Sequence, residues 1–334
     1  MITTPVEHTI LNATQADAMD FVERIQTLWS GYGQIFKAVL HGMPNVANCL
    51  PVVVKHVKWP TQRHHPTGWV SDFSHQRKVR SYEVECAFYT RYAAQCDADC
   101  RVPRLIAIEP HEDELLIVLE DLDAAGFPLR KYRLSMREIE LTLKWLAHFH
   151  GAFLGVEPGG LWPIGTYWHL DTRPDELAQM GDGPLRQAAG KIDAMLNRAT
   201  FQTLVHGDAK VANFCYGRGG KNVAAVDFQY VGGGCGMKDV AYFLGSCLHE
   251  DECERRESQL LDWYFSCLKH AVTVYGKTVA FSRLESEWRE LYHLAWVDFY
   301  RFIRGWTVEN RASDDYSERL TRKVLDTLSK RDGL

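Results

Sequence analysis

A short β-like segment at residues 204–228 interrupts a stretch of chain that otherwise has helical periodicity, and it constrains the fold more than any other feature. Within it, apolar residues flank a polar turn rich in Gly, Lys and Asn at 217–222, which is typical of an antiparallel hairpin. A hairpin centred on this turn sets Asn213 opposite Asp227, give or take one residue, and directly opposed side chains have Cβ atoms ~4.5–5.5 Å apart. Asp208 precedes the first strand by a short loop. We therefore expect these three polar side chains to meet.

The three side chains, together with Lys210, are the residue types that phosphoryl transfer requires. An amide oxygen from Asn213 and a carboxylate from Asp227 suit one Mg²⁺, which prefers hard oxygen ligands and also binds phosphate and water. Asp208 can accept the proton of an attacking hydroxyl, and Lys210 can offset the charge that develops on the transferring phosphate. The sequence thus predicts Asp208 and Lys210 as catalytic residues and Asn213 and Asp227 as metal ligands.

The composition argues against several other classes of protein. The chain has 334 residues, a formal net charge of −5 and no long run of Lys and Arg, so nucleic acid is a poor candidate partner. The longest apolar runs, such as Leu115–Leu119, are far shorter than the ~20 residues of a membrane-spanning helix. Residues 1–15 lack the pattern of a signal peptide. Nine cysteines scattered through apolar segments favour reduced thiols, and we expect a cytoplasmic protein.

The periodic pattern breaks near residues 121–127, where we place a boundary between two lobes, 1–122 and 123–334. The second lobe is mainly helical and opens with a capping box at Ser135 and Glu138. The irregular stretch at 59–78 is interpreted as an ordered cover over a phosphate-binding loop, with a contact to the substrate as the alternative. The first lobe mixes helices and strands, with helical patterns at 16–28 and 81–94 and strand patterns at 34–40, 51–57, 105–108 and 115–119.

The motif residues also resemble a known superfamily. The segment His206-Gly207-Asp208, Asn213 five residues later and Asp227-Phe228-Gln229 have the spacing of the catalytic loop and metal motif of protein-kinase-like enzymes. Gly in the middle of the first motif and Gln at the end of the second differ from protein kinases and resemble the aminoglycoside phosphotransferase and choline kinase branch. Within it, Lys210 and the Asp-Phe-Gln motif most resemble the ecdysteroid-kinase-like group, as does the stretch at 65–85.

The resemblance implies an α+β, two-lobed protein-kinase-like fold, with an N-terminal antiparallel sheet lobe that binds nucleotide and a larger, mainly helical lobe that carries catalysis and the acceptor. It implies that ATP and Mg²⁺ bind in the cleft, where a strand lysine is oriented by a glutamate on a helix. Lys55, in a segment rich in β-branched residues, suits the first role, with Lys37 and Lys58 as rivals. Glu85 suits the second, with Glu83 as its rival.

Two further nucleotide contacts follow from the resemblance. Ser30, Gly31 and Gly33 would form the loop over the phosphates, since glycines let the backbone turn tightly and approach phosphate oxygens. The third glycine of the full Gly-x-Gly-x-x-Gly pattern is missing. Glu120 and Leu122, at the lobe boundary, would offer backbone groups to adenine.

The expected acceptor is a small molecule with a hydroxyl group. Asp239, which begins the next helix, comes only twelve residues after Asp227, and a protein kinase needs a longer segment there to dock a peptide. Asp239 is itself predicted to tie the metal loop to the start of its helix. Aromatic residues on the late helices indicate a core with an apolar pocket, which favours a hydrophobic or sterol-like alcohol; they are Trp288, Tyr292, Trp296, Phe299, Tyr300, Phe302 and Trp306.

Three alternatives stay open. An aminoglycoside- or macrolide-type antibiotic phosphotransferase would need a strongly acidic pocket, whereas the acidic cluster at 250–254 has the pattern of a solvated helix face. A choline phosphotransferase would need an aromatic cage. A nucleotide-binding pseudokinase, acting as a binding module, would have Asp208, Lys55 or Asp227 turned away from the cleft. No nucleic acid or membrane partner is predicted, and no protein partner can be inferred.

Overall fold

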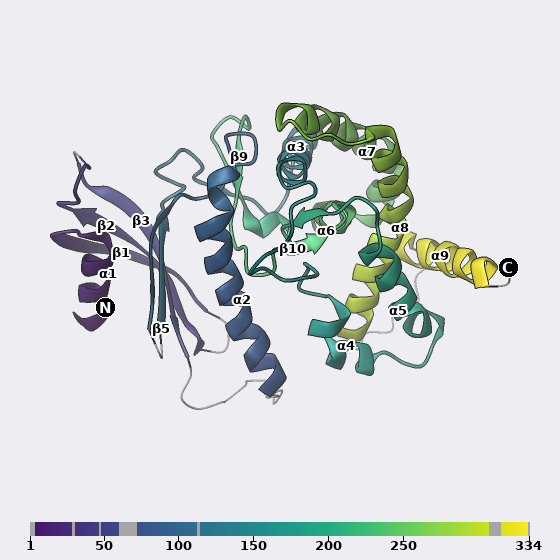
Figure 1. Cartoon of the computed structure of the whole chain (residues 1–334), viewed down its shortest axis with the longest axis horizontal. Helices are drawn as coiled ribbons and strands as arrows, with labels where there is room; N and C mark the ends of the chain where they lie inside the picture. The colour runs from purple at the N-terminus through teal and green to yellow at the C-terminus, as the bar shows by residue number, and fades with distance from the viewer. Residues whose placement is uncertain are drawn as a thin grey trace.

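The computed structural model describes residues 4–28, 31–46, 48–59, 72–111, 114–306 and 315–332. Within these residues the chain forms a β-sheet lobe followed by a larger, mostly helical lobe (Figure 1). The predicted α+β, two-lobed fold class is therefore confirmed. Most of the predicted cover, residues 60–71, lies outside the described residues, and its last part belongs to a helix.

The first lobe is built on one antiparallel sheet with the strand order β1-β2-β3-β5-β4. Two helices, α1 and α2, belong to this lobe, and α2 lies between the sheet and the second lobe (Figure 1). The elements are α1 (Thr4–Thr14), β1 (Ala18–Thr27), β2 (Gly33–His41), β3 (Leu50–Lys58), α2 (Asp72–Arg91), β4 (Leu105–Pro110) and β5 (Glu114–Glu120).

Alternation along β5 explains how the two faces of the sheet are used. Leu116 and Val118 belong to a buried cluster with Val6 and Ile10 of α1, whereas Ile117 belongs to the main core, which includes residues of α2. Successive side chains of a strand point to opposite faces, so a continuous apolar run fits a strand that is covered on both sides. This burial fixes β3 and β5 in the middle of the sheet, with α2 against the face nearer the second lobe.

The helical pattern predicted at residues 16–28 is wrong, because this segment forms strand β1. β1 is an edge strand, paired only with β2, and almost all of its residues are exposed. Its register also shifts between Phe21 and Glu23 and again between Arg24 and Gln26. An exposed edge strand with two irregularities does not show the two-residue alternation of a half-buried strand. The sequence of this segment therefore predicted a helix instead of a strand.

The second lobe is mainly helical and carries two small sheets, with strand orders β10-β7 and β6-β8-β9. Helix α3 begins at the predicted capping box, in which Ser135 and Glu138 bond each other's backbone N–H groups. No helix among the described ranges is apolar over a length that could cross a membrane. The elements are β6 (Leu129–Arg130), α3 (Met136–Ala152), α4 (Pro174–Gln179), α5 (Pro184–Asn197), β7 (Thr203–Val205), β8 (Phe214–Tyr216), β9 (Val223–Ala225), β10 (Gly232–Gly234), α6 (Met237–Cys247), α7 (Glu250–Val274), α8 (Phe281–Trp306) and α9 (Tyr316–Asp332).

Candidate active site

The residues predicted for catalysis meet around Asp208, in the loop between β7 and a short 3-10 turn that leads into β8. Lys210 Nζ and Asn213 Nδ2 each donate a hydrogen bond to Asp208 Oδ2 at 3.0 Å. The hydroxyl of Tyr242, on α6, donates to the other carboxylate oxygen at 3.2 Å. Asp208 is only 7% exposed, so its carboxylate is held in one position by three donors.

The surroundings of Asp208 make its carboxylate more basic than usual. Burial raises the pKa of this carboxyl, the ammonium of Lys210 opposes that effect, and the nearby carboxylate of Asp227 adds to the rise. The net direction is upward, because removing a charge from water costs more than one ammonium returns. A carboxylate with a raised pKa is a better acceptor for the proton of a hydroxyl.

The hairpin brings Asn213 and Asp227 together next to its paired strands, within the one-residue margin that the sequence predicted. Phe214 pairs with Ala225, so Asn213 lies opposite Val226, whose N–H donates to its carbonyl at 2.9 Å. Asp227 follows directly, with an unusual φ of 70°. A non-glycine residue in this left-handed region is uncommon, and such outliers often mark functional sites.

The donor set fits a hard cation. The amide nitrogen of Asn213 is committed to the backbone carbonyl and the carboxylate of Asp208, so its amide oxygen points elsewhere. Nearby groups, led by Lys55 after the opposing effect of burial, lower the pKa of Asp227, which keeps it ionised. One amide oxygen and one carboxylate are ligands that Mg²⁺ accepts. Among the described residues, no cluster of three or more His, Cys, Asp or Glu could hold a metal ion.

The first lobe contributes a buried ion pair. Lys55 Nζ, on β3, donates to Glu85 Oε2, on α2, at 2.6 Å, and lies 3.6 Å from Asp227 Oδ1. Burial alone would lower the pKa of Lys55, but the carboxylates of Glu85 and Asp227 raise it overall. Lys55 is therefore a fixed positive charge directed at the carboxylate that would bind the metal.

The rival residues are paired elsewhere. Lys37 bonds Asp123 at the lobe boundary, and Lys58 forms an ion pair of 3.1 Å with Glu114. Glu83 accepts a bond from Arg80 at 3.0 Å and is more than half exposed. The packing of α2 on the sheet thus brings together Lys55 and Glu85 and leaves the three rivals outside the cluster.

The structure describes only part of the predicted phosphate loop. Ser30 lies outside the described residues, and Gly31 and Gly33 lie at the turn before β2 with φ of 78° and 119°. A Cβ at Gly33 would lie 2.1 Å from the carbonyl oxygen of His56, so that position admits no side chain. The loop therefore begins β2 in contact with the strand that carries Lys55.

Each of the two linker residues uses one backbone group inside the fold. The N–H of Glu120 donates to the carbonyl of Arg104, and the carbonyl of Leu122 accepts from the N–H of Phe127. The predicted adenine contacts would therefore use the other backbone groups, the Glu120 carbonyl and the Leu122 N–H. An acceptor and a donor two residues apart suit the amine and ring nitrogen on one edge of adenine.

Asp239 holds the catalytic loop, and not the metal loop that the sequence predicted. Its carboxylate accepts the backbone N–H groups of His206 at 2.6 Å and Gly207 at 3.0 Å, and it is fully buried. Gly207 has a φ of 79°, and a Cβ there would lie 2.0 Å from the Tyr230 carbonyl oxygen. The sharp turn before Asp208 thus depends on a glycine and on this carboxylate.

Replacing Asp239 with Ala should destabilise the protein, because two buried N–H groups would lose their acceptor. Each such loss costs about 1–3 kcal/mol, so we expect about 3 kcal/mol less free energy of unfolding. Chemical denaturation would measure it, with Asp251→Ala, at an exposed position of α7, as the control. An Asp239→Ala protein as stable as the control would contradict this role.

Several residues that complete the cluster were not predicted from the sequence. Tyr242 lies one helical turn after Asp239, a spacing that could have signalled a shared face of α6. Gln229, noted only as a departure from Gly, donates from Nε2 to Asp227 Oδ1 at 2.7 Å. Phe228 stacks on Phe88 of α2, with ring centroids 3.9 Å apart, and so ties the metal loop to that helix.

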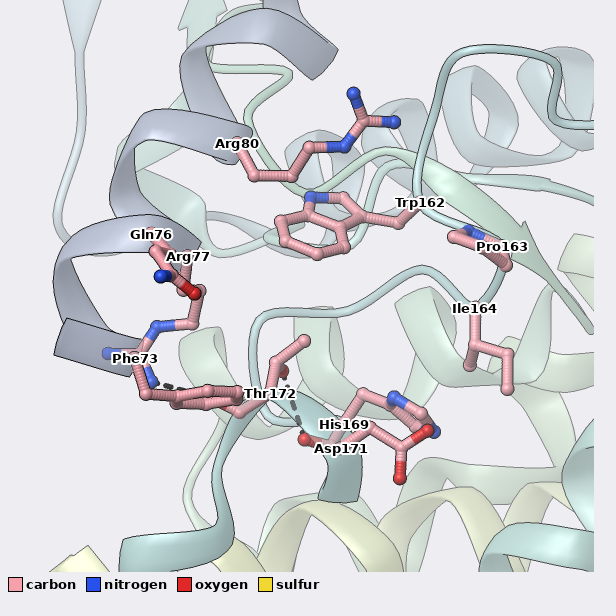
Figure 2. Close-up of a pocket in the computed structure, with 10 residues that line it drawn as sticks. All are labelled: Phe73, Gln76, Arg77, Arg80, Trp162, Pro163, Ile164, His169, Asp171 and Thr172. Atoms are coloured by element: carbon pink, nitrogen blue, oxygen red, sulfur yellow. Dashed lines mark hydrogen bonds between the residues drawn. The ribbon is translucent and has the colours of Figure 1, made fainter.

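A cavity of about 340 Å³ lies between the start of α2 and the loop at 162–172, and its walls are mostly apolar (Figure 2). Phe73, Trp162, Pro163 and Ile164 supply its apolar surface, and polar or charged side chains also line it: Gln76, Arg77, Arg80, His169, Asp171 and Thr172. The Trp162 ring stacks on Tyr230, with centroids 6.1 Å apart, and Tyr230 contacts Tyr167 at 5.9 Å. The Tyr167 hydroxyl lies 3.3 Å from that of Tyr242. A row of aromatic side chains therefore leads from the cavity towards Asp208.

The late aromatic residues are divided between the core and a second cavity. Trp288 and Tyr292 are fully buried, as expected of core residues. Trp296, Phe299 and Tyr300 line a cavity of about 250 Å³ between α6, α8 and the start of α9. The late aromatic residues therefore include both core residues and residues that line a cavity.

The fold and the cluster define a two-lobed enzyme of the kinase-like class. The model of the ecdysteroid kinase-like family matches residues 72–157 and 182–276, more than half of the chain, and the chain belongs to this family. It is therefore a kinase-like phosphotransferase with a hydroxyl group as acceptor, as the sequence predicted. None of the curated proteins matches the chain.

Solved structures with a similar arrangement include aminoglycoside phosphotransferases. One from Streptomyces rimosus, in complex with ADP and streptomycin, is 15% identical, with a TM-score of 0.46 over 87% of this chain and 99% of that one. The GDP complex of an aminoglycoside 2'-phosphotransferase of type IIIa is 13% identical, with a TM-score of 0.45 over 97% and 99%. At this similarity, their ligands say nothing about those of the present chain.

Proposed function

We propose that this protein transfers the γ-phosphoryl group of ATP, with Mg²⁺, to a hydroxyl of a small and rather apolar alcohol. The observation that carries the proposal is the convergence of two clusters in one cleft. Asp208, Lys210 and Asn213 come from the helical lobe, and Lys55 and Glu85 come from the sheet lobe and α2. Asp227 lies between them and contacts Lys55.

In this proposal, Asn213 and Asp227 hold the metal ion, which would neutralise charge on the phosphates. Lys55, oriented by Glu85, binds the phosphate chain, and the backbone of Glu120 and Leu122 binds the adenine. Gly31 and Gly33 let the chain approach the phosphates closely, together with Ser30, which lies outside the described residues.

Asp208 accepts the proton of the acceptor hydroxyl as its oxygen bonds to the γ-phosphorus, and the bond from that phosphorus to ADP breaks. The raised pKa of Asp208 supports this role. Lys210 is bonded to Asp208, and its side chain is 41% exposed, so its amine can also face the transferring phosphate. The charges needed by the reaction are thus positioned before substrate binds.

The apolar cavity and the aromatic row support an acceptor with an apolar body. The cavity beside Trp162 is lined by aromatic and aliphatic groups, and the charged groups along it include Arg77 and Arg80 as well as Asp171. Such a lining does not favour a polycation, which would need several carboxylates. The convergence of Asp208, Lys55 and Asp227 likewise favours turnover over a pseudokinase.

The proposal is tested by incubating the pure protein with Mg²⁺, radiolabelled ATP and a panel of alcohols that ranges from sterols to aminoglycosides and choline. We expect label to be transferred to one or more apolar alcohols. If label is transferred only to aminoglycosides or choline, the proposal of an apolar alcohol as acceptor is wrong. If the protein does not bind ATP at all, the kinase proposal itself is refuted.

Truncating Trp162 should weaken binding of the acceptor more than it slows the chemical step. The Trp162→Ala variant loses a ring that lines the cavity, and we expect the KM for the alcohol to rise about ten-fold, while the KM for ATP stays unchanged. Trp263→Ala is the matched control, since that indole also donates to a backbone carbonyl but is 40% exposed on α7. An unchanged acceptor KM would place the acceptor elsewhere.

A further inference from the structure

A second lysine of the cleft, Lys78, has no role in the function proposed above. It lies on α2, two helical turns before Glu85, and its Nζ donates to Gln229 Oε1 at 2.8 Å. Among the described residues, no carboxylate forms an ion pair with it. Its side chain is partly buried, and the partners that the structure gives its ammonium, the Gln229 amide and the Tyr82 ring, are both neutral.

Lys78 and Lys55 converge on the same place. Their amines lie 4.7 Å and 5.3 Å from the centroid of one ring, that of Tyr82. Gln229 bridges Lys78 to Asp227, because its Oε1 accepts from the lysine and its Nε2 donates to Asp227 Oδ1 at 2.7 Å. Lys55 reaches the same carboxylate oxygen at 3.6 Å. Sheet, helix and metal loop therefore present two amines around one carboxylate.

Of the three lysines described around Asp227, Lys78 forms no ion pair within the described part of the chain. Lys55 is paired with Glu85, and Lys210 with Asp208. Burial and the positive charge of Lys55 lower the pKa of Lys78 to about 8, although the carboxylates of Asp227 and Glu85 act in the opposite direction. An anion that arrived beside it would reverse this effect. Polar groups held in an unfavourable state commonly mark functional sites.

We propose that Lys78 is a second phosphate-binding lysine, supplied by α2, which binds the terminal phosphates of the nucleotide beside Lys55. This inference rests on the proposed function, because it requires a nucleotide triphosphate with its metal at Asp227. Phosphate groups bound near Asp227 come next to the amine that Gln229 positions. In this proposal Gln229, at the position where protein kinases have Gly, orients both Lys78 and Asp227 through the two ends of its amide.

The test compares binding of adenosine and of Mg²⁺ with AMP-PNP to the full chain by calorimetry. For Lys78→Met we expect affinity for AMP-PNP to fall about ten-fold or more, the usual effect of losing a charge-assisted hydrogen bond, and affinity for adenosine to stay within about two-fold. Lys78→Arg should retain most of the affinity. Lys58→Met is the control, because it removes one charge at an exposed lysine of the same lobe. It should leave the affinity for both ligands unchanged.

A second measurement uses the wild-type protein, so it holds even if a variant fails to fold. Brief labelling with an amine-reactive reagent, followed by mass spectrometry, should modify Lys78 less when AMP-PNP is bound than when adenosine is bound, with Lys58 unaffected. The inference about Lys78 would be overturned if Lys78→Met lost the same affinity for adenosine as for AMP-PNP, or if AMP-PNP did not change the labelling of Lys78. Either result would leave the proposed function standing. A wild-type protein that binds neither ligand would overturn the proposed function as well.

Discussion

The Asp208→Asn variant is expected to lose phosphoryl transfer almost completely, with kcat lowered about 10²- to 10⁴-fold, the usual contribution of a general base. The amide keeps the size of the carboxylate and an oxygen for the Tyr242 hydroxyl, but it cannot accept the proton of the acceptor. Nucleotide binding should persist, because Lys55, Glu85 and Asp227 are untouched. Single-turnover transfer from radiolabelled ATP measures the chemical step directly.

Thermal unfolding separates this effect from a loss of structure. Because burial raises the pKa of Asp208 in the fold, its ionised form is disfavoured there, and a neutral residue should leave the melting temperature unchanged or slightly higher. Asp20→Asn, at an exposed position of β1, is the control and should retain full activity. Near-normal transfer by Asp208→Asn would show that another group takes the proton.

The Asp227→Asn variant is expected to lose its response to metal. An amide is a weaker ligand than a carboxylate, so the concentration of Mg²⁺ that gives half-maximal activity should rise at least about 100-fold. The variant should fold, because Asn tolerates the positive φ of this position as well as Asp does. Activity measured across Mg²⁺ concentrations at saturating ATP gives the result.

The control for this variant is Asp262→Asn, which changes a largely exposed carboxylate on α7. The wild-type protein, Asp227→Asn and Asp262→Asn should all bind adenosine with the same affinity, because a nucleoside has no phosphate for the metal to bind. If Asp227→Asn keeps the wild-type Mg²⁺ dependence, the metal is bound by other residues, and the assignment of both Asp227 and Asn213 must be withdrawn.

The part of the site that lies within a short segment could be predicted well. Asp208, Lys210 and Asn213 are separated by at most five residues, and a hairpin fixes Asp227 beside them through local hydrogen bonds. The strands β3 and β5 were also predicted from local pattern, because β3 is rich in valine and β5 is a short apolar run that follows an acidic turn.

Prediction failed where a long-range contact decided the outcome. The edge strand β1 has an exposed and irregular pattern that carries no two-residue signal, so only its pairing with β2 makes it a strand. Asp239 was expected at the metal loop, and the packing of α6 places it under the catalytic loop instead. Tyr242 was missed because its hydroxyl reaches Asp208 across 34 positions of sequence.

The sequence by itself determined the class of fold, the family and the composition of the catalytic segment, since these depend on periodicity and on residues close together in the chain. Only the tertiary structure decided which lysine and which glutamate pair, because Lys55 meets Glu85 through the packing of α2 on the sheet. It also decided that Lys78 and Gln229 join the cleft, 151 positions apart. Such contacts depend on how whole elements pack, and no local pattern records that packing.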